Sequence, residues 1–158
     1  MKITAQEEYG LRCLLQLARA PHNQLVSVKE IAAKEGLSSA YVEKLLRILS
    51  KTGLVHSVRG VKGGYILNRP ASSVSLGEVV RALGTMETTD HICRSFTGNG
   101  ETCVHFSNCG IRSAWLGLTT AIQTFLDQTM LDSLLGDEYA VSHRLANRLG
   151  GEAGRTKT

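Results

Sequence analysis

The stretch "IAAKEGLSSAYVEKLLRILSKTGLVHSVRGVKGGYIL" (residues 31–67) decides the fold of this chain of 158 residues. It begins inside a short helix over "VKEIAAKE", which an S-x-x-E capping box opens at Ser27. Gly36 predicts a tight turn at the end of that helix. Ser38 or Ser39 caps a longer helix, whose buried stripe at helical spacing comprises Val42, Leu45, Leu46 and Leu49. This order is the layout of a helix-turn-helix.

The same stretch ends in a basic hairpin. Leu54–Val58 and Tyr65–Leu67 are predicted to be two short strands, and the glycine-rich tip between them carries Arg59 and Lys62. A basic hairpin directly after a helix-turn-helix predicts a winged helix.

Helices are also predicted on both sides of this stretch. A T-x-x-E capping box at Thr4 opens the first helix, and Pro21 closes it. A similar box at Ser75 opens a helix that extends to about Leu83. A short helix is predicted over "DEYAVSHRLANRL" near the C-terminus, and the polar residues after Gly150 are expected to be disordered.

From Ile111 to Leu135 the pattern is helical again. The apolar residues near one face are Trp115, Leu118, Ile122, Phe125, Leu126 and Met130. So long a helix carries more apolar face than its own small domain can easily cover. Packing against the same helix of a second subunit would cover it, and packing within the chain is the alternative.

The fold class predicted from these elements is mainly α with a small β-hairpin wing. A winged helix-turn-helix domain occupies residues 1–84, and a cysteine-containing loop follows at 85–110. A long dimerisation helix occupies residues 111–135, and a partly disordered tail occupies 136–158.

Charge is distributed unevenly along the chain. The net charge is +4, yet residues 1–70 hold 11 Lys/Arg against five Asp/Glu, while residues 71–135 hold three against six. A basic N-terminal half joined to an acidic middle indicates a module that binds a polyanion, with a second element attached. A solvated basic face is the alternative.

Several function classes are disfavoured. No apolar run approaches the roughly 18 residues of a membrane span, and "MKITAQEEYG" lacks the layout of a signal peptide. We therefore expect a cytoplasmic protein without a membrane partner. The chain also lacks a phosphate loop, a G-x-S-x-G motif and paired carboxylates in a plausible cleft, so we do not expect an enzyme.

Three of the four cysteines lie in the polar stretch "CRSFTGNGETCVHFSNC", at Cys93, Cys103 and Cys109. A cytosolic location disfavours a disulfide and favours metal or redox chemistry. An iron–sulfur cluster needs thiolates, and a flexible loop with glycines lets three of them converge. A zinc site of three cysteines and His105 is the chemical rival. Cys13 lies among apolar residues and is expected to be a small core residue.

The candidate DNA-reading surface lies on the second helix of the helix-turn-helix and on the wing. Glu43 can accept a hydrogen bond from a cytosine amino group, and Arg47 can reach a guanine edge or a phosphate. Arg59 at the wing tip suits a narrow minor groove. The complete set of predicted DNA-binding residues is Ser38, Ser39, Tyr41, Glu43, Lys44, Arg47, Arg59 and Lys62.

Over residues 1–135 the sequence resembles the Rrf2 family of bacterial winged-helix regulators. The resemblance rests on "EYGLRCLLQLA", on the stretch 31–67, on "SLGEVVRAL" and on three cysteines ahead of a long helix. It implies a homodimer whose long helices cross and whose reading heads bind a palindromic site in double-stranded DNA. It also implies that Glu43 and Arg59 contact bases and the minor groove. Ala40 departs from the polar residue that family members can use there.

The resemblance also implies a cofactor. One branch of the family binds an iron–sulfur cluster through three cysteines of this loop, which match Cys93, Cys103 and Cys109. The first gap is longer here than is usual in the family. Whether the cluster would be 2Fe–2S or 4Fe–4S stays open.

The fourth ligand has several candidates, namely His105, His91, Glu7 and Glu8. Unpaired carboxylates are unusual at the edge of a buried stripe, although they also complement the helix dipole. In family members an acidic residue matching Glu8 completes the cluster from the other subunit. The branch that uses a histidine three residues after the last cysteine has Arg112 at that position here. Glu8 is therefore preferred over His105.

The function expected from these features is transcription regulation, and repression in particular, by a dimer whose DNA affinity depends on the cluster and thus on redox state, nitric oxide or iron. The alternative is a cluster-independent regulator of the same family. Its control would come from a partner protein, a small molecule, zinc or thiol oxidation.

Overall fold

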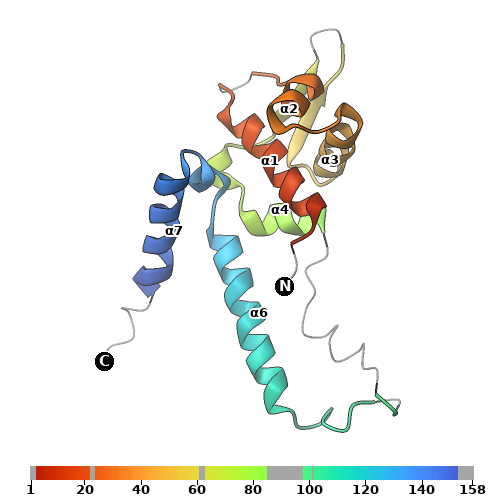
Figure 1. Ribbon diagram of the computed structural model, residues 1–158, viewed down its shortest axis with the longest axis vertical. Helices are drawn as coiled ribbons and strands as arrows, with labels where there is room; N and C mark the ends of the chain where they lie inside the picture. Colours follow the sequence, from red (N-terminus) through yellow and green to blue (C-terminus); the bar gives the residue numbers. More distant parts are fainter. Residues whose placement is uncertain (1–2, 22–23, 61–62, 85–97, 101, 153–158) are drawn as a thin grey trace.

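A computed structural model describes residues 3–21, 24–60, 63–84, 98–100 and 102–152, with side chains up to residue 148. The head of the molecule holds the N-terminal elements, and two helices extend from it (Figure 1). The helices are α1 (Ala5–Arg19), α2 (Val28–Glu35), α3 (Ser39–Lys51), α4 (Leu76–Leu83), α6 (Gly110–Gln128) and α7 (Glu138–Glu152). The hairpin consists of β1 (Val55–Val58) and β2 (Gly64–Leu67), and two short 3₁₀ turns are η1 (Ala71–Ser73) and η2 (Leu131–Leu134).

The predicted helix-turn-helix is formed by α2 and α3. Gly36 ends α2 in the left-handed conformation at φ 66°, which a residue without Cβ adopts at no steric cost. The Ser38 side chain caps α3 by accepting from the Tyr41 amide. At the start of α2 only half of the predicted capping box forms, because the Glu30 carboxylate pairs with Lys34 at 2.8 Å instead.

The predicted wing is the antiparallel hairpin of β1 and β2. Its register pairs Val55 with Leu67 and Val58 with Gly64. The wing is fastened to the head by an isolated bridge between Tyr65 and the segment before α2. These elements confirm a mainly helical winged helix.

A single core lies beneath these elements. Side chains from α1, α3, β1 and α4 meet there, and the largest of the fully buried ones include Leu14, Leu45, Leu46, Leu49 and Leu83. Cys13 is fully buried in the same core, as its apolar neighbours predicted. At roughly 1.5–3 kcal/mol for each buried aliphatic side chain, this core is the main stabilising contribution to the head.

The long C-terminal helix is shorter than predicted. α6 ends at Gln128 rather than near Leu135, and Thr129 is extended. The Thr129 carbonyl accepts from the Leu76 amide at 2.8 Å, and an antiparallel bridge joins Ser75 to Met130. These long-range hydrogen bonds hold the chain extended where the apolar period alone would continue a helix.

α6 is joined to the head only near its C-terminal end. Arg81 of α4 pairs with Asp127 of α6 at 2.8 Å, while the large side chains toward the other end of α6 are exposed, among them Ile111, Trp115, Leu116 and Leu118. Figure 1 shows α6 extending away from the head, and among the described helices none lies beside its N-terminal half.

α7 is longer than the predicted helix, since it continues to Glu152. It is fastened by Arg144, which donates to the Ser133 carbonyl at 3.0 Å, and by Arg148, which donates to the Gln128 carbonyl. Disorder was expected after Gly150, whereas Gly151 and Glu152 are helical, and residues 153–158 lie outside the described residues. Within the described part of the chain, no helix combines the length and the apolar character that a membrane crossing requires.

Candidate functional site

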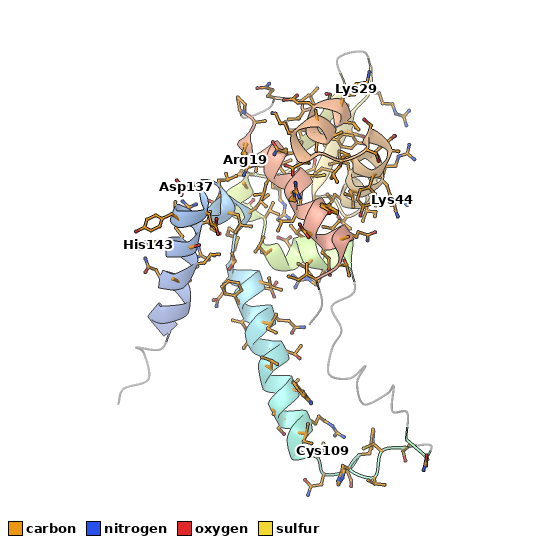
Figure 2. The ribbon with its side chains drawn as sticks, viewed as in Figure 1. Arg19, Lys29, Lys44, Cys109, Asp137 and His143 are labelled. Atoms are coloured by element: carbon orange, nitrogen blue, oxygen red, sulfur yellow. The ribbon has the colours of Figure 1, made fainter. Side chains whose placement is uncertain are left out.

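The candidate site residues fall at two places, at opposite ends of the molecule. Figure 2 shows Lys44 on the head and Cys109 at the far end of α6. At 1.5 Å per residue, Cys109 lies about 27 Å along the α6 axis from Asp127, where the helix meets α4. The two places are therefore distant within one chain.

The outer face of α3 presents the predicted reading residues. Ser39, Lys44 and Arg47 are exposed, and Glu43 is partly so. Glu43 and Arg47 form an ion pair at 2.7 Å, one turn apart on this face. The pair places a carboxylate acceptor and a guanidinium donor side by side, the two functional groups that read cytosine and guanine edges in a major groove.

Two predicted reading residues also have structural roles. The Ser38 hydroxyl accepts the Tyr41 amide at 3.3 Å, which fixes the first turn of α3. The Tyr41 ring meets the Tyr9 ring of α1 edge-on, with centroids 6.1 Å apart and planes at 81°. Ser38 thus fixes the start of α3, and Tyr41 connects α3 to α1.

The wing tip is basic and open. Arg59 is exposed directly before Gly60, and the side chains of β1 from His56 onward are exposed as well. Lys62 lies outside the described residues, so only Arg59 of the two predicted wing contacts is placed by the structure.

The cysteine segment is a compact turn at the start of α6. The Phe106 amide donates to the Cys103 carbonyl at 2.9 Å, and the Asn108 amide donates to the His105 carbonyl at 3.2 Å. Cys103 and Cys109 are free thiols of intermediate exposure, and Cys109 is the N-cap residue of α6. His105 is exposed.

Cys93 and His91 lie outside the described residues. Among the residues that are described, no group of three or more metal-ligating side chains comes together. Cys103 thus begins the first of two successive turns, and Cys109 follows the second. Neither of the described fourth-ligand candidates, Glu8 and His105, comes together with both of these cysteines.

Arg112 braces this turn from the first turn of α6. Its guanidinium donates to the Phe106 carbonyl at 2.7 Å and lies over the Phe106 ring at 5.3 Å. Its Nε is buried and has no hydrogen-bond partner among the described residues. Sequence reasoning noticed Arg112 only as the replacement for a histidine, and its position three residues after the last cysteine was the available signal.

The two acidic residues at the start of α1 are not equivalent. Glu7 completes the capping box, since its carboxylate accepts from the Thr4 amide at 2.7 Å and from the Thr4 hydroxyl at 2.8 Å. Glu8 is 58% exposed and has only a distant ion pair, at 3.9 Å, with Arg12. The Glu8 carboxylate is therefore accessible for coordinating a metal, while Glu7 is engaged in helix capping.

Arg12 connects this end of α1 to the helix-turn-helix. Its Nε donates to the Glu35 carboxylate at 2.6 Å and a terminal nitrogen donates to the Glu35 carbonyl at 3.2 Å. Gln16 donates to the same carboxylate, whose side chain is only 8% exposed. The hydrogen bond to Glu35 raises the pKa of the Arg12 guanidinium above its ordinary value. The guanidinium also lies over the Tyr9 ring at 5.4 Å.

Sequence reasoning missed the Arg12–Glu35 pair. Twenty-three residues separate the two, and nothing in the local pattern of either helix marks them as partners. Glu35 is the last residue of α2, directly before the turn into α3, so Arg12 holds the turn of the reading head from α1.

The profile of the Rrf2 family, described as an iron-dependent transcriptional regulator, matches residues 3–137. The chain belongs to the Rrf2 family. The Rrf2 protein of Nitratidesulfovibrio vulgaris is 35% identical over 137 residues, which cover 87% of this chain and 89% of that protein.

Solved structures of family members share the fold. The IscR of T. potens superposes with a TM-score of 0.64 at 29% identity, covering all of this chain and 94% of that one. The global cysteine regulator CymR of B. subtilis superposes with a TM-score of 0.66 at 28% identity, covering 84% of this chain and 94% of that one. The Rrf2-family chain is thus a DNA-binding transcription regulator, and the prediction that it is not an enzyme is confirmed.

Proposed function

We propose that this Rrf2-family chain is a homodimeric repressor that binds a palindromic operator in the cytoplasm and whose affinity depends on an iron–sulfur cluster. The observation that carries the proposal is the turn holding the free thiols Cys103 and Cys109 at the start of α6. Its donors are soft sulfur ligands, which such clusters need. Cys93 would supply the third thiolate and Glu8 the fourth ligand, with His105 as the weaker alternative.

The uncovered face of α6 supports the dimer. Ile111, Trp115, Leu116 and Leu118 are each 48–67% exposed, and large apolar patches mark interaction surfaces. A second copy that packs its own α6 against this face would bury it. Two copies also place two reading heads on one DNA molecule, as a palindromic operator requires.

The position of Glu8 supports ligation between subunits. Within one chain the cysteine turn lies at the far end of α6, while α1 packs on α4 in the head (Figures 1 and 2). Glu8 of one subunit therefore reaches a cysteine turn only if that turn belongs to the other subunit.

The contacts of Arg12 support a route from the ligand to the DNA-reading surface. When bound, the cluster supplies one-electron redox chemistry and reactivity toward oxygen and nitric oxide. Glu8 held by the other subunit can no longer share Arg12, which then pairs with Glu35 alone. Glu35 directly precedes the turn between α2 and α3. Whether Glu8 pairs with Arg12 or binds the cluster therefore changes the contacts that hold the start of α3.

The function is tested by anaerobic purification, visible absorption and operator binding. A brown protein whose absorption bleaches with oxygen or nitric oxide, and whose operator affinity changes on bleaching, is expected. Glu8→Ala should shift the spectrum or shorten the lifetime of the cluster. Glu30→Gln is the matched control, since Glu30 also lies in a first helical turn and pairs with a cation four residues on. A colourless protein containing zinc would contradict the proposal.

A second candidate is cluster-independent regulation, favoured by the likeness to CymR, which is described as a cysteine regulator. A partner protein, a small molecule, zinc or thiol oxidation would then control DNA binding through the same cysteines. Unchanged operator affinity after cluster removal, together with a change on adding a thiol oxidant, would favour this candidate.

A further inference from the structure

The contacts of Arg112 are unusual for an arginine near a helix N-terminus, where a positive charge opposes the helix dipole. The guanidinium turns back onto the cysteine segment, with its hydrogen bond to the Phe106 carbonyl at 2.7 Å and its stacking on the Phe106 ring at 5.3 Å. Both contacts fall on the residue midway between Cys103 and Cys109. Arg112 therefore belongs to the thiol turn rather than to the outer surface of α6.

One donor of this side chain is left without an acceptor. Among the buried side-chain nitrogen and oxygen atoms of the described residues, Arg112 Nε alone lacks a hydrogen-bond partner. An unpaired buried donor costs about 1–3 kcal/mol, and native proteins keep few of them. The carbonyl and the ring together fix the plane of the guanidinium and with it the direction of the Nε–H.

The chemistry of the turn indicates what kind of acceptor Arg112 Nε would bind. The Phe106 amide bonds to the Cys103 carbonyl at 2.9 Å, so the residue that Arg112 holds is itself tied to one of the two cysteines. With three thiolates and the Glu8 carboxylate, every ligand of the proposed cluster would be an anion. A positive, directed N–H donor suits such a group, and hydrogen bonds to sulfur together with net charge set cluster potentials.

We propose that Arg112 is a positioning residue of the cluster site. It holds the turn between Cys103 and Cys109 in place, and its Nε–H donates to a sulfur of the cluster or of its cysteine ligands. This inference rests on the proposed function. Since the reduced cluster carries one more negative charge, the loss of Arg112 disfavours the reduced form and lowers the reduction potential.

The test compares the reduction potentials of Arg112→Gln, Arg112→Lys and wild-type protein, each loaded anaerobically with iron and sulfide and titrated by visible absorption. Arg112→Gln should lower the ratio of reduced to oxidised cluster about tenfold at a fixed potential, which is 59 mV for a one-electron couple. Arg112→Lys keeps the charge but lacks the planar fork, and it should not restore the wild-type value. Arg148→Gln, an arginine variant in α7, is the control and should leave the potential unchanged.

A second measurement needs no cluster. In ¹⁵N NMR spectra of the metal-free protein, the amide signals of Phe106 and Asn108 should move in both Arg112 variants and stay in place in the Arg148 control. An unchanged potential in Arg112→Gln, or full restoration by lysine, would overturn the inference and leave the proposed function standing. If Arg112→Gln takes up no cluster, moved amide signals support the inference and unmoved signals overturn it.

A wild-type protein that takes up no cluster would overturn the proposed function and the sulfur-donor role of Arg112 with it. The amide signals of the metal-free protein would then decide the positioning role alone. The two failures are therefore distinguishable.

Discussion

Replacing Gly77 with alanine tests how tightly α4 and α6 are joined. A Cβ at this position would lie 1.8 Å from Asp127 Oδ1, 2.9 Å from its Cγ and 3.0 Å from an Arg81 nitrogen. A methyl group at 1.8 Å from an oxygen cannot be accommodated, so either the Asp127 side chain rotates away or the two helices separate. The observed position of the Asp127 side chain therefore depends on residue 77 having no Cβ.

The magnitude follows from the two ways of relieving the overlap. If Asp127 rotates, its pair with Arg81 is lost, and because both side chains are about half exposed that pair contributes only about 0.2–1 kcal/mol. If the helices separate, overpacking costs about 1–3 kcal/mol. Rotation of the half-exposed Asp127 side chain is the cheaper route, and alanine gains up to about 1 kcal/mol of helix propensity over glycine. We therefore expect Gly77→Ala to change the free energy of unfolding by less than about 1 kcal/mol.

A double-mutant cycle measured by urea denaturation separates this cause from others. In an Asp127→Ala background the overlap no longer exists, and alanine in a helix is favoured over glycine by up to about 1 kcal/mol. Gly77→Ala should then be stabilising by the full helix propensity, with a coupling energy of about 0.2–1 kcal/mol between the two positions. An equal effect in both backgrounds would refute the reasoning, because the cost could not then come from Asp127.

Three further predictions concern the head. Burial raises the pKa of the Cys13 thiol to about 11, so iodoacetamide at neutral pH should modify Cys13 only after unfolding, as peptide mass spectrometry would show. Hydrogen bonds from the Ser75 amide and then from Arg69 lower the pKa of Glu78. The stabilisation by Glu78 is therefore complete above the ordinary glutamate pKa and is lost as the pH falls through the lowered pKa. Glu78→Gln should accordingly weaken the dependence of the free energy of unfolding on pH in the acid range. Leu45→Ala, at a fully buried position of α3, should lower the free energy of unfolding by about 2–5 kcal/mol in chemical denaturation.

The parts of the fold that were predictable are those with local signals. The capping of α1 at Thr4, the turn at Gly36 and the stripe of α3 each depend on residues within one or two turns, and the structure has them where the pattern placed them. At the start of α2, the Glu30 side chain does not complete the predicted capping box, because Lys34 one turn later competes for the same carboxylate.

The parts that could not be predicted depend on distant contacts. The end of α6 at Gln128 is set by hydrogen bonds from the Leu76 amide to the Thr129 carbonyl and from the Leu131 amide to the Val74 carbonyl. Each pair lies more than 50 residues apart in the sequence, and no periodicity reveals such a pair. For the candidate site, residue types identified the thiols and the face of α3, and the family resemblance selected Glu8. That Glu7 is engaged in capping while Glu8 is exposed could be learned only from the structure.

In the proposed dimer, a signal from the cluster could reach the reading head along two different paths. A path inside one chain would run from Cys109 along about 27 Å of α6 and across the joint at Asp127, whose ion pair with Arg81 is weak because it is half exposed. If Glu8 of the other subunit binds the cluster, a second path would begin at α1 itself and would not run along α6. It reaches Arg12 one helical turn later and from there the buried Glu35 carboxylate at 2.6 Å, directly before the turn into α3. Ligation by Glu8 would therefore influence the reading head more directly than any rearrangement transmitted along α6.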